Sequence, residues 1–244
     1  MRRIWIDLRS TVRQLRNSPG FTLVAIAILA LGIGATTAIY TLLDQALLRS
    51  LPVRNPDRLV QLNGSGAWNG NTDGYGGDRS NYFSYPMYLN LRDRNKVFSG
   101  VLAASQATVG LQWHNQPEAV SAELVSGNYF DALGVQPALG RLLLRSDNQV
   151  KNGSPVAVLS FGYWQQRFGA DPRVLGQTVG INGHPFTIVG VVAPGFHSVI
   201  GGDTPAIFAP MMMKPEVEPG RDDLADFQSR WLNIIARLKP GISR

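Results

Sequence analysis

The side chains suited to acid–base or metal chemistry are few and widely spaced in this chain of 244 residues. The three histidines are His114, His184 and His197, and none of them forms the His-x-x-x-His or His-Glu-x-x-His spacing that binds zinc. Each is therefore interpreted as a turn or surface residue. The chain has no cysteine, which excludes disulfides, thiolate zinc sites and cysteine nucleophiles.

Motifs for nucleotide binding and for serine hydrolysis are also missing. A phosphate-binding loop requires Gly-Lys before Ser or Thr, and Gly-Lys occurs nowhere. Gly-x-Ser-x-Gly, which presents the nucleophile of many hydrolases, is absent. Asp222 with Asp223, and Glu118 with Glu123, are scattered carboxylates, and two carboxylates alone do not make an acid–base pair. The sequence predicts no catalytic residue, no cofactor and no metal ligand.

The formal net charge of +6 is concentrated at the N-terminus. Residues 1–20 contain five arginines and one aspartate, a net +4, so the other 224 residues carry only +2. Nucleic-acid binding requires a concentrated basic face on the folded domain, so no nucleic-acid partner is expected. A basic N-terminus instead favours a position near anionic lipid.

An apolar segment of 23 residues without a charge covers residues 21–43. As a helix that rises about 1.5 Å per residue it is roughly 34 Å long, enough to cross the hydrocarbon core of a bilayer. Ser18 and Pro19 stand where an N-cap and a first helical residue are expected. The sequence predicts a transmembrane helix within residues 18–48.

A stripe of small residues, Ala30, Gly34 and Ala38, recurs at every fourth position of this segment. Such a stripe lets another membrane helix approach closely, so these three residues are predicted helix-packing positions. The alternative is chance, because alanine and glycine are common in membrane helices.

Residues 1–17 are predicted to form an amphipathic interfacial helix. Apolar side chains fall on one helical face, and the opposite face is basic, with Arg2, Arg9, Arg13 and Arg16. A loosely structured basic tail is the alternative. The excess of arginine before the apolar segment predicts a cytoplasmic N-terminus. A cleavable signal peptide fits less well, because the apolar core is long and its one Ala-x-Ala lies too early for cleavage.

Residues 49–244 are predicted to form an α+β region with mainly antiparallel pairing, outside the cytoplasm. The turn Asn182-Gly183 is a strong hairpin signal. Residues 174–202 are uncharged but contain repeated helix breakers, so they are interpreted as sheet and not as a second span. The predicted strands cover residues 57–63, 97–104, 107–113, 119–125, 156–159, 178–181 and 185–192, and the predicted helices cover residues 84–95, 128–133 and 161–168. Phe161, Trp164 and Phe168 are expected in the core, with a ligand platform as the alternative. Residues 211–213 are expected at a strand end, with an adaptable contact surface as the alternative.

Four segments together carry a resemblance to a known family: DLRSTVRQLRNSPGFTLVAIAILALGIGATTAIYTLLDQALLRSLP, LVSGNYFDALGVQPALGRLL, SPVAVLSFGYWQQRFGADPRVLGQTVGINGHPFTIVGVVAPGF and WLNIIARLKPG. On these segments the sequence resembles the FtsX-like, MacB-like ABC permeases with a periplasmic core domain, particularly the duplicated orphan permeases. The resemblance covers residues 7–243.

The resemblance implies a first transmembrane helix, a large periplasmic domain and at least three further membrane helices, so the chain resembles the N-terminal piece of a longer permease. It further implies a discontinuous sub-domain, residues 50–135 with 229–244, interrupted by an inserted one, residues 136–228. The implied partners are the bacterial inner membrane, a separate cytoplasmic ABC ATPase and a second permease half in a dimer or pseudo-dimer. A periplasmic adaptor is left open.

The leading hypothesis is a non-enzymatic permease subunit of an ABC-type export or lipoprotein-handling system. Such a system works by mechanotransmission: ATP hydrolysis by a separate ATPase chain moves the periplasmic domain of the permease. The alternative is a single-span, membrane-tethered periplasmic enzyme or sensor. The gene beyond Arg244 separates the two, because only the permease requires more apolar spans.

Overall fold

The computed structural model of the protein describes residues 19–43, 53–64, 72, 82–114, 116–201 and 204–242. The chain forms two compact units, Met1–Ser50 and Leu51–Arg244. The predicted amphipathic helix over residues 1–17 lies outside the described residues.

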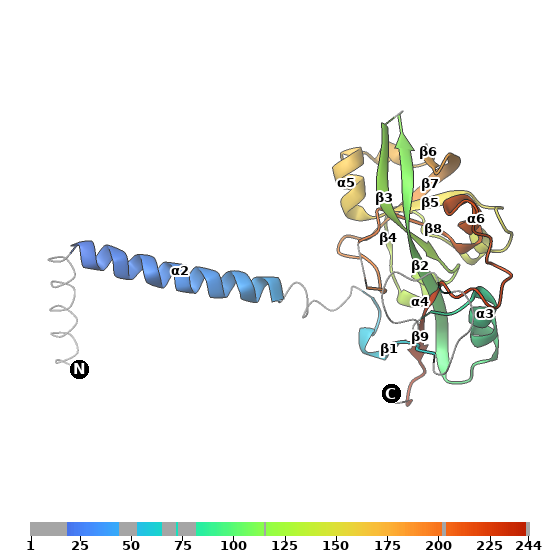
Figure 1. Ribbon diagram of the computed structural model, residues 1–244, viewed down its shortest axis with the longest axis horizontal. Helices are drawn as coiled ribbons and strands as arrows, with labels where there is room; N and C mark the ends of the chain where they lie inside the picture. Colours follow the sequence, from blue (N-terminus) through green and yellow to red (C-terminus); the bar gives the residue numbers. More distant parts are fainter. Residues whose placement is uncertain are drawn as a thin grey trace. The chain divides into compact units, whose positions relative to one another are not determined.

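The first unit contains the helix α2 (Pro19–Leu43), which has 25 residues (Figure 1). The helix includes the predicted segment and has Pro19 as its first residue, where the missing proline N–H leaves no helical bond unmade. The hydroxyls of Thr36 and Thr37 donate to backbone carbonyls one turn earlier, so these polar groups are satisfied within the helix. Over the residues described with their side chains, no helix reaches the length and apolar character that a membrane crossing requires. The membrane-spanning role of residues 21–43 stays a prediction.

The second unit is built on one sheet in which the described strands follow the order β1-β9-β2-β3-β8-β5-β7-β4, with β6 paired to β2 and β7. The pairs β3–β8 and β5–β7 are parallel, and the other pairs are antiparallel, as the sequence predicts for most of the sheet. The strands are β1 (Leu59–Gln61), β2 (Phe98–Trp113), β3 (Gln116–Val125), β4 (Pro137–Gly140), β5 (Val156–Leu159), β6 (Thr178–Ile181), β7 (His184–Val192), β8 (Ile207–Pro210) and β9 (Asn233–Leu238).

Short helices connect these strands, and two of them begin at serine N-caps. Ser84 accepts a hydrogen bond from the Met87 amide, and Ser160 accepts one from the Tyr163 amide, so each cap satisfies a donor that the first turn leaves free. The helices of this unit are α3 (Tyr85–Arg94), α4 (Tyr129–Leu133), α5 (Phe161–Phe168) and α6 (Lys214–Val217), with the 3-10 turns η2 (Pro56–Arg58), η4 (Arg145–Asn148), η5 (Pro172–Val174) and η6 (Met211–Met213).

Both faces of the sheet are covered, because successive residues of a central strand enter two different apolar clusters. In β2, Val101 and Ala103 belong to one cluster, and Leu102 and Ala104 belong to the other. This alternation follows from the period of two in a strand. The second cluster is rich in aromatic rings from α4 and β8, including Tyr129 and Phe130.

The hairpin predicted around Asn182-Gly183 is confirmed: both residues have positive φ, 47° and 86°, as a type I′ turn requires. Residues 174–202 contain β6 and β7, as expected for sheet. One prediction was wrong: residues 97–104 and 107–113 form the single strand β2 of 16 residues. Residues 211–213, predicted at a strand end, form the turn η6 directly after β8.

The tip of the β2–β3 hairpin lies at the end of this unit opposite to β1 and β9 (Figure 1). The sheet does not test the predicted division into two sub-domains, residues 50–135 with 229–244 and residues 136–228. That division stays a prediction. Strands from both predicted sub-domains belong to the one sheet.

Candidate functional site

The residues that the sequence predicts for helix packing are only partly described. Ala30 and Gly34 are exposed on α2, and a Cβ added at Gly34 would meet no atom within 4 Å. The side chain of Ala38 lies outside the described residues, as do Arg2, Arg9, Arg13 and Arg16. Their packing and interfacial roles stay predictions.

The candidate acid–base residues are held apart by structural interactions. His184 pairs with Glu216, while His114 and His197 are exposed in a turn and a loop. Glu118 accepts from the Tyr163 hydroxyl and from Arg167, and Asp222 pairs with Lys151. Among the described residues, no group of three carboxylates or imidazoles is placed to hold a metal ion.

One notable arrangement is the junction, the corner of the second unit where its first strand β1 and its last strand β9 lie side by side. The incoming strand β1 and the outgoing strand β9 are antiparallel neighbours, with Leu59 opposite Arg237. The Arg237 guanidinium donates from Nη1 to the Asn55 carbonyl at 3.0 Å and from Nε to the Ala132 carbonyl at 3.1 Å. One side chain therefore ties the incoming segment and α4 to the outgoing strand.

The same junction requires a glycine at the end of α4. Gly134 has φ of 74°, and a Cβ there would lie 3.0 Å from the Cβ of Arg54. The Arg54 amide donates to the Leu133 carbonyl at 2.8 Å, which fixes this close approach. The pKa of Arg237 lies below its ordinary value. Burial is the largest cause, and the nearby Arg54 and Arg58 charges lower the pKa further. The junction therefore gathers three arginines, Arg54, Arg58 and Arg237, beside the single carboxylate of Asp57.

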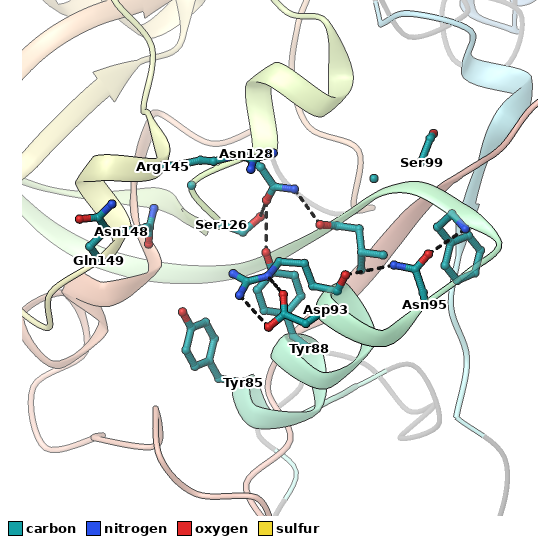
Figure 2. Close-up of a pocket in the computed structure, with 15 residues that line it drawn as sticks. Tyr85, Tyr88, Asp93, Asn95, Ser99, Ser126, Asn128, Arg145, Asn148 and Gln149 are labelled. Atoms are coloured by element: carbon teal, nitrogen blue, oxygen red, sulfur yellow. Dashed lines mark hydrogen bonds and ion pairs between the residues drawn. The ribbon is translucent and has the colours of Figure 1, made fainter.

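A polar pocket of about 570 Å³ adjoins this junction (Figure 2). Gly100, which lies in the pocket wall, is opposite Arg237 in the β2–β9 register. Four segments form the walls: α3, the first residues of β2, the turn that follows β3, and η4. The lining residues are Tyr85, Tyr88, Arg92, Asp93, Asn95, Phe98, Ser99, Gly100, Val101, Ser126, Gly127, Asn128, Arg145, Asn148 and Gln149.

A buried hydrogen-bond network fixes one wall of the pocket (Figure 2). Asn128 Oδ1 accepts from the Tyr88 hydroxyl at 3.2 Å and from the Ser126 hydroxyl at 2.9 Å. Asn128 Nδ2 donates to the Val101 carbonyl at 2.8 Å, and Ser126 Oγ accepts from the Ala103 amide. Because these groups satisfy one another, this wall is preformed.

The same turn after β3 also lies in close contact with η4. A Cβ at Gly127 would lie 2.8 Å from the Cα of Arg145, so only glycine permits this spacing. Asn148 donates to the Val125 carbonyl at 3.2 Å and accepts from the Met212 amide at 3.1 Å. The turn η4 is thus fastened to β3 and to η6.

The charged groups of the pocket are unequally satisfied. Arg92 donates to both carboxylate oxygens of Asp93, at 2.7 and 3.0 Å, and its guanidinium lies over the Tyr88 ring. The exposed side chain of Arg145 makes no hydrogen bond or ion pair with any described residue. The pocket therefore presents one positive charge without a counter-charge.

A second group that the sequence did not single out as functional is Glu123 in β3. Its side chain is fully buried, and burial raises its pKa to about 7, while Ser198 and Tyr129 lower it by less. Sequence spacing had placed Glu123 only as one of two strand carboxylates. Its hydrogen-bond partner Tyr129 lies six residues later in the chain. A turn separates the two residues, and the sequence does not fix its geometry, so the contact could not be predicted.

Two solved structures share this fold. The periplasmic region of MacB from Actinobacillus actinomycetemcomitans matches with a TM-score of 0.54 and 22% identity, covering 71% of this chain and 74% of that one. The extracellular domain of the noncanonic ABC-type transporter YknZ from Gram-positive bacteria matches with a TM-score of 0.50 and 18% identity, covering 66% and 75%. These likenesses show the fold.

The sequence model of the MacB-like periplasmic core domain matches residues 22–244. The chain belongs to this family, whose domains are parts of ABC-type transporter permeases, which confirms the resemblance seen in the sequence. The comparison with curated protein sequences gives no match.

Proposed function

We propose that the protein is a permease subunit of an ABC-type export or mechanotransmission system. In this proposal α2 crosses the inner membrane, the N-terminus is cytoplasmic, and the unit from Leu51 onward is periplasmic. ATP is hydrolysed by a separate chain, and the membrane helices pass the resulting movement to the periplasmic unit. A second permease half completes the assembly.

The pairing of β1 with β9 is the observation that carries this proposal. The incoming strand follows the segment after α2, and the outgoing strand lies directly beside it, with Leu59 opposite Arg237. A domain whose two connections meet at one corner receives any relative movement of those connections at that corner. The Arg237 contacts with Asn55 and Ala132 extend the corner into the sheet and α4, so the unit would move as a body.

Membrane extraction and single-cysteine labelling test the topology. The chain has no cysteine, so each introduced one is unique. Arg173, whose side chain is 88% exposed, is the external position, and Ser10 is the N-terminal one. In intact spheroplasts a membrane-impermeant maleimide should label Arg173→Cys, and it should label Ser10→Cys only after lysis. Carbonate washing should leave the chain in the membrane.

Release by carbonate, or equal labelling of the two positions in intact spheroplasts, would contradict the proposal. The coupling itself is tested in native membranes with a fluorophore at Arg173→Cys. ATP should change its quenching, and vanadate, which traps many ABC ATPases, should hold the changed value. Unchanged quenching under both conditions would favour a tethered domain that acts alone.

A further inference from the structure

A short segment after β7, residues 194–201, forms a flap on the aromatic face of the sheet. Two of its side chains, Phe196 and Ile200, are buried in the apolar cluster that also contains Tyr129. Among the described residues, the backbone of the flap makes a single hydrogen bond to another element, from the Val199 amide to the Tyr129 hydroxyl at 3.4 Å. Side-chain packing and this one tether therefore hold the flap.

The tether ends on the carboxyl group of Glu123. The Tyr129 hydroxyl that accepts from Val199 donates to Glu123 Oε1 at 2.8 Å. Ser198 of the flap also lies close enough to lower the pKa of Glu123. The polar connections of the flap thus converge on one side chain that solvent does not reach.

The surroundings of Glu123 do not compensate a negative charge. β2 and β8 place Gln106 and Phe208 opposite it, and α4 supplies the Tyr129 hydroxyl. The titratable side chain of the flap is His197, which is exposed. In the described part of the chain, the groups that shift the pKa of Glu123 are neutral, and burial outweighs them and raises it to about 7.

The flap is the covering element that can move with the smallest loss of backbone hydrogen bonds. β3, which contains Glu123, is paired on both sides, with β2 and β8. α4 is fixed at both ends, because the Tyr129 amide donates to Ser126 and the Leu133 carbonyl accepts from Arg54. Water that solvates an ionised Glu123 should therefore enter by displacement of the flap.

We propose that the flap is a proton-controlled device, which stays closed over Glu123 while the carboxyl group is protonated and opens more often once it is ionised. The flap also touches the junction, since Val199 lines a cavity of about 190 Å³ together with Leu59 of β1 and Ile235 of β9. Opening would withdraw Val199 from that corner. The proposal concerns the second unit alone, so it does not depend on the proposed function.

Hydrogen exchange of the full chain in detergent micelles, from pH 4.5 to 8, tests the proposal. Protection factors, corrected for the pH dependence of intrinsic exchange, report how often the Val199 and Ile200 amides open. They should fall by up to about 300-fold between pH 4.5 and 7, about tenfold for each pH unit, and then level off. Low concentrations of denaturant should not accelerate this exchange further, because a local opening exposes little surface.

Glu123→Gln should remove the pH dependence of flap protection, since glutamine still accepts from Tyr129 but does not ionise. His197→Gln is the matched control in the same flap and should keep the full dependence. The proposal is overturned if protection of Val199 does not change with pH, or if the change persists in Glu123→Gln or is lost in His197→Gln. Acceleration by denaturant as strong as in the centre of the sheet would also overturn it, because the opening would then be global.

Discussion

Tyr129 donates its hydroxyl hydrogen to Oε1 of Glu123 at 2.8 Å, in a region where both side chains are fully buried. The other carboxylate oxygen of Glu123 is buried without a hydrogen-bond partner. Glu123 lies opposite Gln106 in β2 and Phe208 in β8, at the centre of the sheet. A carboxyl group in this position is more stable when it is protonated, because no charge compensates its ionised form.

The stability of the protein should therefore depend on the protonation of Glu123. The pKa of Glu123 is about 7 in the folded state, against an ordinary value of 4.5, so the folded state binds more protons between these two pH values. The free energy of unfolding should fall as the pH rises from about 4.5 to 7, by about 3 kcal/mol, and then level off. Denaturant unfolding at a series of pH values measures this decrease.

Glu123→Gln separates this effect from other titrations. Glutamine still accepts a hydrogen bond from Tyr129 but never ionises, so the decrease between pH 4.5 and 7 should disappear in the variant. Glu118→Gln is the control, because that carboxylate is already bonded to Arg167 and is partly exposed. A decrease that persists in Glu123→Gln would assign the effect to another group.

Gly127→Ala should destabilise the second unit by about 1–3 kcal/mol, because the added Cβ would meet the Arg145 backbone at 2.8 Å and force η4 outward. Gly162→Ala is the matched control, since a Cβ there meets nothing within 4 Å and lies in the first turn of α5. That change should be neutral or stabilising by up to about 1 kcal/mol. Equal unfolding midpoints for the two variants would refute this reading of the pocket wall.

Lys214→Met should cost about 3 kcal/mol of folding free energy. The Lys214 ammonium is buried, donates to Glu218 at 2.6 Å, and lies 4.4 Å from the centroid of the Trp231 ring. Its removal leaves acidic groups without their cation. Lys151→Met, at an exposed pair with Asp222, should cost below about 1 kcal/mol. The unfolding free energies of the two variants are measured at neutral pH. Similar losses for Lys214→Met and Lys151→Met would contradict a structural role for the buried Lys214 ammonium.

Arg237→Ala should loosen the junction by about 1–3 kcal/mol, because two backbone carbonyls lose their charged donor. The loss should be local, so hydrogen exchange should speed up at Leu59 to Gln61 before it does in the centre of the sheet. Arg237→Lys should recover only part of the protection, since an ammonium lacks the forked donors. Uniform acceleration across the sheet would instead indicate a global loss of stability.

Local signals in the sequence located the elements that contain their own start and turn residues. The predicted helices 84–95 and 161–168 correspond to α3 and α5, which the structure caps with Ser84 and Ser160, and Asn182-Gly183 forms its predicted hairpin, because capping and turn geometry depend on neighbouring residues. The strand β2 was divided in error at Ser105 and Gln106. Those polar residues pair across the sheet with Leu124 and Glu123, so tertiary pairing carries the strand through a polar step.

The pocket could not be read from the sequence, because its walls come from segments far apart in the chain. Tyr88 and Asn128 are 40 residues apart, and their hydrogen bond exists only once β2 and β3 have paired. The role of Gly127 is similarly invisible, since it depends on the approach of η4 and not on backbone φ. The family resemblance supplied the overall fold without any of these contacts.

The pairing of β1 with β9 also decides how this unit would respond to tension. Hydrogen bonds between antiparallel strands are perpendicular to the strands, and the two connections meet at the Leu59–Arg237 end of the pair. Tension that separates the residues before β1 from those after β9 therefore breaks the β1–β9 hydrogen bonds one at a time, starting at the Leu59–Arg237 end. It does not load all of these hydrogen bonds together in shear. The Arg237 contacts with the Asn55 and Ala132 carbonyls resist this opening, so they should set how much tension the corner transmits before β1 separates from β9.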